Sequence, residues 1–267
     1  MKSAPQLFEQ FLNTTPLFPE DKDYFNFHYP RYKLMIELID SLSKKLNRKS
    51  IKLLDLGSAY LHLSCLCSLR GIDVCALDLG KFVNQPFLQE RAKKYHIDLR
   101  ESDFSKEKIP FNKNTFDIVL LLETLEHFYF DPTPLLKDVY NVLKDDGYFV
   151  ITVPNFFRLG NKLRMLFNRQ ILPFVKTPLG EGHCHEYGAS ELKELLIQTG
   201  FKKVDIFYFD YSISGNSLFT KLIKKFFCFF CPSLSGNLLA IAQKKQTGLI
   251  KYKEKIEALK KSEKGVE

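Results

Sequence analysis

The chain has 267 residues, of which 26% are charged and 45% apolar, and its formal net charge is +8. This composition is typical of a globular protein and excludes a collagen, a coiled coil and a wholly disordered chain. No apolar run approaches the roughly 18 residues of a membrane-spanning helix, the N-terminus lacks the long apolar stretch of a signal peptide, and six cysteines in so long a chain indicate no disulfide scaffold. We therefore expect one or two domains in a cytoplasmic protein.

The first 46 residues are expected to form a helical arm. Residues 1–30 are rich in aromatic side chains and are interrupted by four prolines. This pattern predicts a short helix followed by an irregular segment, because proline breaks a helix interior. From Arg31 to Leu46 the apolar residues recur at helical spacing, which predicts a helix with one packed face.

From residue 51 onward, short apolar strands alternate with helices. The predicted strands are Ile51–Leu56, Ile72–Leu77, Ile97–Arg100, Phe116–Leu122, Tyr148–Val153, Lys202–Phe209 and Leu238–Gln243. Helices are predicted over about 61–69, 82–95, 132–143, 156–168 and 189–199, with a turn at 145–147. This alternation indicates an α/β protein with a doubly wound, mostly parallel seven-stranded sheet. The long connection between the last two strands is compatible with an antiparallel edge.

Most of the excess positive charge lies near the C-terminus. Residues 244–267 contain eight lysines and four glutamates, a net charge of +4, and Lys221, Lys224 and Lys225 add +3. The main body is therefore almost neutral. Because a nucleic-acid-binding protein usually needs a broad basic face, nucleic acid is not expected to be the principal partner.

The first strand leads into a turn that has the features of a nucleotide-type site. Gly57 follows this strand, and Asp78 ends the next strand 21 positions later. Ligands of doubly wound sheets bind beyond the carboxyl ends of the strands, and a carboxylate at this spacing suits both hydroxyls of a ribose. The later glycines of a dinucleotide loop are replaced by Ala59 and His62. NAD and FAD are thus disfavoured, an oxidoreductase is a remote alternative, and the absence of a Lys-Ser/Thr phosphate loop disfavours ATP or GTP hydrolysis.

A cofactor without phosphate tolerates such a loop better, and S-adenosylmethionine (SAM) is one. Over about residues 50–243 the sequence resembles the class I SAM-dependent methyltransferases. The matching segments are LLDLGSAY, VCALDLG, ESDF, FDIVLLLETLEHF, LKDDGYFVITVPN and GHCHEYGASELKELLIQTGF. The chain departs from the family in the loop, where a second or third glycine is usual. The resemblance implies a Rossmann-like methyltransferase fold and SAM as the methyl donor.

The resemblance also implies which residues hold the cofactor. Asp55, Gly57 and Ser58 would line its methionine part. Asp78 would hold the ribose, with Leu79 against the adenine.

Three further residues of the cofactor site follow from the same resemblance. Asp103 would accept a hydrogen bond from the adenine amino group while Phe104 covers the ring. Glu123, at the end of the fourth strand, would lie under the reactive end of the cofactor. The alternative for Asp78 and Asp103 is that each is merely a solvated carboxylate at a strand end.

Three histidines are candidates for catalysis. Methyl transfer from a sulfonium is an in-line displacement in which positioning supplies much of the acceleration. When the acceptor is a hydroxyl, a base with a pKa near neutrality helps, and histidine is the usual choice. His127 follows the fourth strand, and His183 and His185 lie in a loop that is expected to cover the site.

A divalent metal ion is a second interpretation of the same region. Glu123, Glu126 and His127, followed by His183, resemble the metal-binding pattern of small-RNA 2′-O-methyltransferases, and a related stretch occurs in ubiquinone-pathway O-methyltransferases. Two carboxylates and two imidazoles could hold an ion that acidifies an acceptor hydroxyl. The alternative is that Glu126 and His127 only hydrogen-bond the loop. We favour this alternative, because similar pairs occur in methyltransferases that use no metal.

Residues 218–230 predict an amphipathic helix with an aromatic stripe bordered by lysines. Such a helix can lie in a bilayer interface, or its stripe can cover the edge of the sheet, which is the favoured interpretation. Peripheral membrane contact would suit a lipid-linked glycan intermediate or a quinone precursor as the acceptor. Bacterial polysaccharide-cluster methyltransferases look similar over 155–243, which makes a sugar hydroxyl the first expectation.

These observations predict a SAM-dependent methyltransferase that O-methylates a small molecule or a glycan or lipid-linked intermediate. Residues 1–46 would form the helical arm, 47–243 the methyltransferase domain with an acceptor lid at 155–188, and 244–267 a basic tail. The enzyme is expected in the cytoplasm, with contact at the inner face of a membrane as a further option. The alternative function is a non-catalytic methyltransferase-like scaffold or binding protein whose degenerate loop no longer holds the cofactor.

Overall fold

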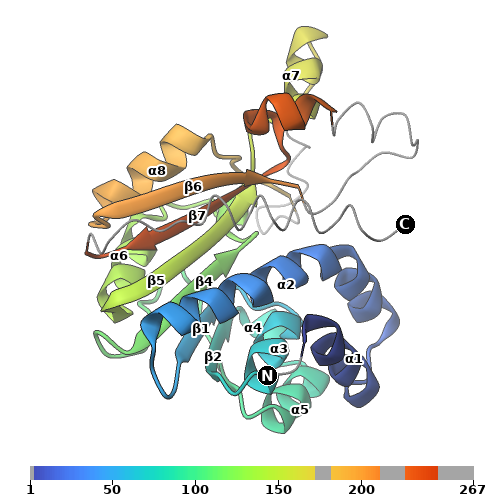
Figure 1. Cartoon of the computed structure of the whole chain (residues 1–267), viewed down its shortest axis with the longest axis vertical. Helices are drawn as coiled ribbons and strands as arrows, with labels where there is room; N and C mark the ends of the chain where they lie inside the picture. Colours follow the sequence, from blue (N-terminus) through green and yellow to red (C-terminus); the bar gives the residue numbers. More distant parts are fainter. Residues whose placement is uncertain (1–2, 172–181, 211–225, 246–267) are drawn as a thin grey trace.

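The computed structural model describes residues 3–171, 182–210 and 226–245 (Figure 1). Its centre is a seven-stranded sheet with the order β3-β2-β1-β4-β5-β7-β6. The strands are β1 Lys52–Leu56, β2 Asp73–Asp78, β3 Asp98–Glu101, β4 Phe116–Leu122, β5 Leu143–Pro154, β6 Lys203–Phe209 and β7 Asn237–Gln243. Only β7 runs antiparallel to its neighbours β5 and β6. The predicted fold class and its antiparallel edge are confirmed.

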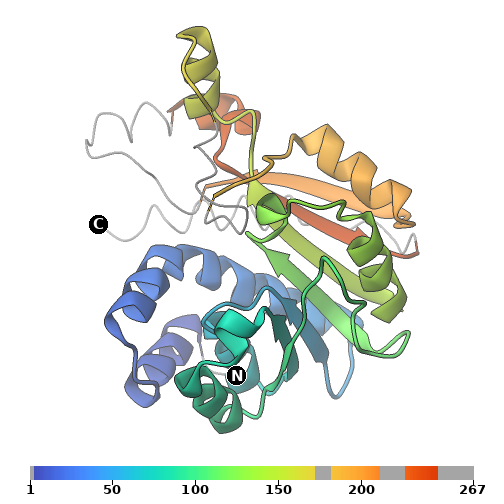
Figure 2. The same cartoon turned by 180° about the vertical axis from the view of Figure 1, so that it is seen from behind.

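Helices cover both faces of this sheet (Figures 1 and 2). The helices are α1 Ala4–Thr14, α2 Pro19–Leu46, α3 His62–Leu69, α4 Gly80–Val83, α5 Pro86–Lys94, α6 Thr133–Val142, α7 Leu159–Leu166 and α8 Ala189–Gln198. Side chains of α1, α2, α3 and α5 form one apolar core with one face of the sheet, while α6 and α8 form a second core on the other face.

The central strand β4 shows why an unbroken apolar run folds here as a strand. All seven of its side chains are buried. Ile118 and Leu120 face the core beneath α2, whereas Val119 and Leu121 face the core beneath α6 and α8. Side chains of a strand alternate between the two faces, so a strand that is covered on both sides needs no polar residues.

The N-terminal arm is more regular than its prolines predict. Residues 19–30 are not an irregular segment, because α2 begins at Pro19 and continues through Pro30 to Leu46. Proline suits the first position of a helix, where its missing N–H has no partner to lose. Pro30 removes one internal hydrogen bond, but Phe25 and Tyr32 on either side are buried in the core. Their burial compensates for the lost bond.

Three other predicted boundaries need correction. The turn expected at 145–147 lies inside β5, opposite a register irregularity between Phe116 and Ile118. The single helix predicted over 82–95 is divided into α4 and α5, and Pro86 starts the second of them. The helix predicted over 156–168 is shorter and is α7.

The Phe-rich segment 218–230 is only partly described, since residues 218–225 lie outside the described residues. Residues 226–230 are helical, and their four phenylalanines are exposed rather than packed against the sheet. The expectation that the stripe covers the sheet edge is therefore wrong for these residues. Among the described helices, none is long and apolar enough to cross a bilayer.

Candidate active site

The site is built at the carboxyl edge of the parallel strands, beginning with the turn after β1. Gly57 has a φ of +74°, and a Cβ atom there would lie 2.5 Å from Oγ1 of Thr124, at the end of β4. Its N–H donates to the carbonyl of Leu77 in β2 at 2.9 Å. Only glycine fits a position with this dihedral angle and this close approach. Gly57 therefore brings together the ends of β1, β2 and β4.

The rest of the loop keeps glycine-like conformations without glycine. Ala59 has a φ of +46° and Leu61 a φ of +60°. Left-handed backbone costs an L-residue on the order of 1–2 kcal/mol. The loop is held by hydrogen bonds from the N–H of Ala59 to Asp78 and from the N–H of Leu61 to the carbonyl of Ser58. The glycine-poor loop thus adopts the left-handed conformations that glycine ordinarily supplies.

Asp78 closes β2 directly beside this loop. Its Oδ2 accepts from the N–H of Ala59 at 2.6 Å and its Oδ1 from the N–H of Leu79 at 2.7 Å. The residue is 7% exposed, and burial raises the pKa of its carboxyl while these two hydrogen bonds oppose the rise. Asp78 is therefore not a solvated strand-end carboxylate. Each oxygen keeps a lone pair, which fits a ribose diol.

The residues expected around the methionine part of the cofactor differ in their surroundings. Asp55 is buried and accepts from Ser64 Oγ of α3 at 2.5 Å, and burial raises the pKa of its carboxyl to about 6. Its hydrogen bond fixes α3 beneath the loop. Ser58 Oγ is buried and has no hydrogen-bond partner among the described residues. A buried hydroxyl without a partner at this place fits a polar cofactor group.

The residues expected around the adenine are more open. Leu79 is 41% exposed. Asp103 accepts from Ser105 and pairs with Lys106 at 2.7 Å, and these contacts lower the pKa of Asp103 to about 2. Phe104 packs edge-on against Phe128. Asp103 thus has the contacts of a turn-forming carboxylate with part of its surface in water, and its role toward adenine stays a prediction.

Glu123 follows β4 with a φ of +50°. Its N–H donates to the carbonyl of Thr152, and its carboxylate accepts from Asn237 Nδ2 at 3.3 Å. Glu123 therefore lies at the same edge of the sheet as Gly57. It is held there by the ends of β4 and β5 and by the start of antiparallel β7.

Two residues of the helical arm lie beside this site. Tyr24 comes from the segment predicted to be irregular, and its ring lies 5.0 Å from that of Tyr60 in the loop, whereas Arg31 starts the helix predicted over 31–46. Burial raises the pKa of Tyr24, the charge and hydrogen bond of Arg31 oppose the rise, and the carboxylates of Glu123 and Asp78 add to it. Arg31 is buried, and its charge partly offsets the effect of burial on the pKa of Asp55. Positions 24 and 31 are two helical turns apart, so a helix predicted through both would have placed their side chains on the same face. A guanidinium here could pair with the α-carboxylate of a bound amino-acid group.

Two of the three candidate histidines are brought together beyond β4. The rings of His127 and His183 lie 5.1 Å apart between centroids. His127 Nδ1 donates to the carbonyl of Gly182 at 3.2 Å, and burial lowers the pKa of its imidazole. His185 is instead bound to Glu191 at 2.6 Å. The structure thus places His127 and His183 in one group and turns His185 toward α8.

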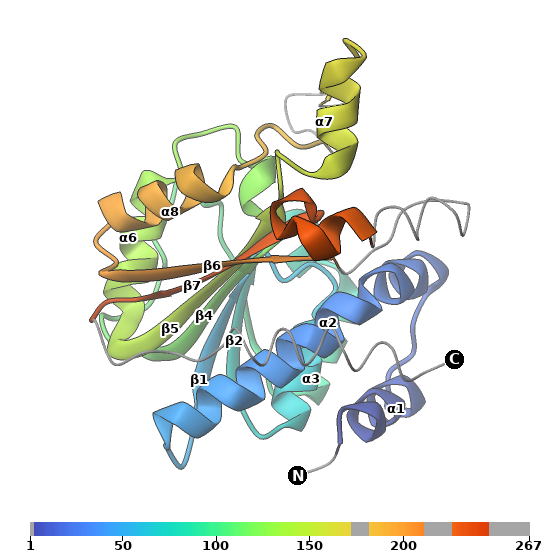
Figure 3. The same cartoon turned by 45° about the horizontal axis from the view of Figure 1, so that its top comes forward.

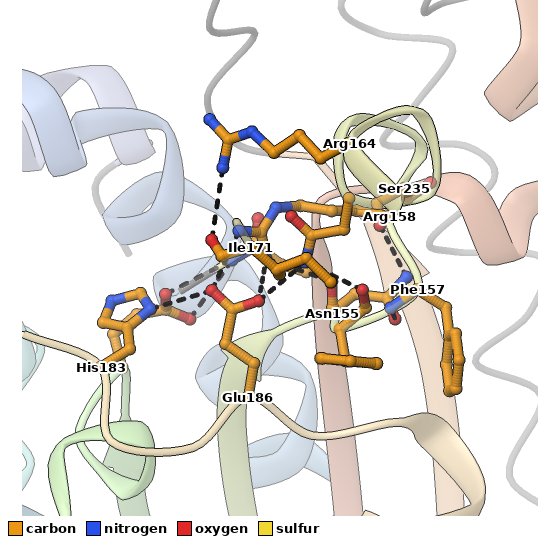
Figure 4. A network of polar contacts seen from close by, with 12 residues as sticks. Asn155, Phe157, Arg158, Arg164, Ile171, His183, Glu186 and Ser235 are labelled. Atoms are coloured by element: carbon orange, nitrogen blue, oxygen red, sulfur yellow. Dashed lines mark hydrogen bonds and ion pairs between the residues drawn. The ribbon is translucent and has the colours of Figure 1, made fainter. Parts of the chain in front are cut away.

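A buried polar network anchors the segment that carries His183 (Figure 4). Glu186 accepts from Arg158, from Asn161 at 3.0 Å and from His183 at 3.1 Å. Burial alone would raise the pKa of Glu186, but its partners lower the pKa to about 2. The carboxylate therefore stays charged and connects α7, at the start of the 155–188 segment, to the histidine loop at its end.

The same region contains donors that suit a metal ion. Ligand atoms of Glu126, His127 and His183 all lie within 4.8 Å of one another. Glu126 is buried, and its Oε2 has no hydrogen-bond partner among the described residues. Glu123 is not part of this group. The donor set of one carboxylate and two imidazoles fits a divalent transition metal.

Comparison with known proteins agrees with the fold. A family model described as a methyltransferase domain matches residues 27–206. A protein of Mycolicibacterium smegmatis named "Probable S-adenosylmethionine-dependent methyltransferase" is 29% identical over 115 residues, covering 43% of this chain and 39% of that protein. The ubiquinone/menaquinone biosynthesis C-methyltransferase UbiE of Blochmanniella pennsylvanica is 30% identical over 121 residues, covering 40% of this chain and 47% of its own length.

Among solved structures, the PH0226 protein of Pyrococcus horikoshii is similar in fold, with a TM-score of 0.52 and 18% identity, covering 85% of this chain and 92% of that one. The chain therefore belongs to the methyltransferase domain family, an enzyme family that uses S-adenosylmethionine as the methyl donor. The predicted family resemblance is confirmed. The chain spans less than half the length of the two curated relatives that it matches.

Proposed function

We propose that this protein is a SAM-dependent O-methyltransferase whose acceptor is a hydroxyl of a glycan or of a lipid-linked intermediate. The observation that carries the proposal is the pair of histidines beyond the end of β4, where Thr124 leaves no room for a Cβ atom on Gly57. A base at this edge lies on the side of the sheet where a cofactor held by the β1 turn would present its methyl group.

In this proposal the residues of the first two strand ends bind the cofactor. The loop around Gly57 receives the methionine part, and Asp78 accepts from the ribose hydroxyls. The buried Arg31 supports the same orientation, since it supplies a positive charge beside Asp55. Bound SAM supplies an electrophilic methyl group on a sulfonium. The role of the protein is then to align an acceptor oxygen with that methyl group and to exclude water.

His127 is the proposed general base. Its Nδ1 donates to the carbonyl of Gly182, so the neutral ring carries its lone pair on Nε2. His183 is held by Glu186 and can fix the acceptor or the neighbouring imidazole. Nε2 would take the proton of the acceptor hydroxyl as the bond from its oxygen to the methyl carbon forms and the methyl–sulfur bond breaks, with S-adenosylhomocysteine as the leaving group.

The test combines donor binding with product analysis. SAM should raise the melting temperature, because a ligand that binds only the native state stabilises it. With tritiated SAM and a lipid extract or a soluble glycan fraction, the product should contain a methyl ether, identified by NMR. His127→Ala should lower the transfer rate by about 100-fold and leave the thermal shift unchanged, whereas His96→Ala, an exposed histidine after α5, serves as the matched control.

Other products would contradict the proposal. Methyl attached to nitrogen or carbon would exclude O-methylation but keep the enzyme class. A protein that SAM does not stabilise would instead support the non-catalytic scaffold.

A metal-assisted reaction is the second candidate, favoured by the buried Oε2 of Glu126 beside two imidazoles. An ion held by Glu126, His127 and His183 could acidify the acceptor hydroxyl directly. Dialysis against EDTA should then abolish transfer and Mn²⁺ or Zn²⁺ should restore it, while the thermal shift by SAM persists. If methyl transfer survives EDTA and elemental analysis finds no metal, the metal-assisted reaction is excluded. His127 then acts as the base without a metal.

A further inference from the structure

Helix α7 is packed with its polar side inward. Its one buried residue is Asn161, whose Nδ2 donates to the carbonyl of Phe156 at 2.9 Å and to Glu186 at 3.0 Å. At 3.6 residues per turn, Leu163 and Leu166 lie on the opposite side of the helix, and they are 48% and 74% exposed. A surface helix ordinarily buries its apolar stripe. Here the stripe faces outward.

A second exposed apolar segment lies at the same end of the molecule (Figures 1 and 3). Phe229 and Phe230, in the helical residues 226–230, are 74% and 70% exposed. The chain that leads into α7 is bound to the chain that follows residues 226–230, because Asn155 Nδ2 donates to the carbonyls of Ser233 and Ser235. The exposed apolar side chains of both segments form what we call the end patch: Leu163, Leu166, Phe167, Phe226, Phe227, Phe229 and Phe230.

The exposed charged side chains on and directly after α7 are all basic. Residues 156–171 contain four basic residues and no acidic one. Arg158 pairs with the buried Glu186, and the other three, Lys162, Arg164 and Arg169, are exposed. Lys162 and Arg164 flank the leucine stripe of α7. Two copies of this surface would bring like charges together, which disfavours a dimer through it. A surface that has negative groups at its boundary and an apolar interior would complement the end patch.

We propose that the end patch docks the protein onto a bilayer that contains anionic lipid. The leucine and phenylalanine side chains would enter the interface, and the basic residues would meet the lipid phosphates. α7 is too short to span a membrane, so the contact is peripheral. The patch lies near the carboxyl edge of the sheet, just beyond the end of β5. If the proposed function holds, a lipid-anchored acceptor could reach the histidines while its anchor stays in the bilayer.

Co-sedimentation of the full chain with vesicles tests this proposal. The protein should pellet with vesicles of phosphatidylcholine and phosphatidylglycerol, and much less with phosphatidylcholine alone. The pairs Leu166→Glu/Phe167→Glu and Phe229→Glu/Phe230→Glu should each lower the bound fraction by about tenfold or more. The matched control is Ile197→Glu, an equally apolar exposed site on α8 (50% exposed), and it should bind as the wild type does.

The thermal shift by SAM checks that each variant is folded, and it separates docking from methyl transfer. Wild-type protein that pellets equally with both kinds of vesicle, or variants that bind as well as wild type, would overturn the proposal. A concentration-dependent dimer that the same substitutions dissociate, without vesicle binding, would also overturn it and would assign the patch to contact between copies.

Discussion

Replacing Asp78 by asparagine should lower the affinity for SAM by at least about 100-fold, since two charge-assisted hydrogen bonds to the ribose hydroxyls would be lost. The two backbone N–H groups that Asp78 accepts from, those of Ala59 and Leu79, would also face an amide that can accept through only one atom. Isothermal titration calorimetry with SAM measures the loss.

The hydrogen bonds of Asp78 change what an alanine substitution tests. Asp78→Ala would leave two partly buried N–H groups without a partner, at about 1–3 kcal/mol for each that stays unsatisfied, so it would perturb the loop as well as the ribose contact. Asp73→Asn, at the exposed start of the same strand, is the matched control. Retained wild-type affinity in Asp78→Asn would contradict the ribose assignment.

Replacing Arg91 by methionine should lower the free energy of unfolding by about 3–5 kcal/mol, the range for breaking a buried ion pair. Arg91 Nη2 donates to Asp21 at 2.6 Å, its Nη1 donates to the carbonyl of Tyr60 at 2.7 Å, and His62 contacts Asp21 at 2.5 Å. All three charged or titratable side chains are buried. Without the guanidinium, Asp21 would be left with His62 alone. Urea denaturation measures the change.

An exposed pair supplies the control for Arg91. Arg100→Met removes the partner of Asp98 on the surface and should cost less than about 1 kcal/mol. The pairing also predicts a pH dependence. Burial alone would raise the pKa of Asp21, but His62 and Arg91 hold it below its ordinary value, so its stabilisation is present at neutral pH and is lost in acid. Equal losses in Arg91→Met and Arg100→Met would contradict this account.

The sheet could be predicted because its signal is local. Strands such as β4 are unbroken apolar runs, and Asp78 closes β2 at a spacing that sequence alone reveals. The arm could not be predicted in the same way. Pro19 and Pro30 indicate helix breaks, whereas burial of Phe25 against the core, a tertiary effect, holds one continuous helix.

Candidate site residues were predicted better as a group than singly. Sequence spacing could not distinguish His183 from His185, since both lie in one loop, and only their partners Glu186 and Glu191 separate them. Arg31 carries no motif, and its place beside Asp55 depends on the crossing of α2 over the sheet. The phenylalanines after residue 225 followed a helical pattern, but a pattern does not say which face meets water.

Pro30 lies at the point where helix α2 changes the part of the molecule that it covers. It divides α2 into a C-terminal half that packs on the sheet and an N-terminal half that carries Tyr24 toward the β1 turn. Because proline lacks an N–H, the carbonyl four residues earlier loses its helical donor, and bending is easiest at that point. The N-terminal half is nevertheless held by buried contacts, since Asp21 pairs with Arg91 and His62 and the ring of Tyr24 lies 5.0 Å from that of Tyr60. The wall of the β1 turn is therefore in place before a nucleoside binds.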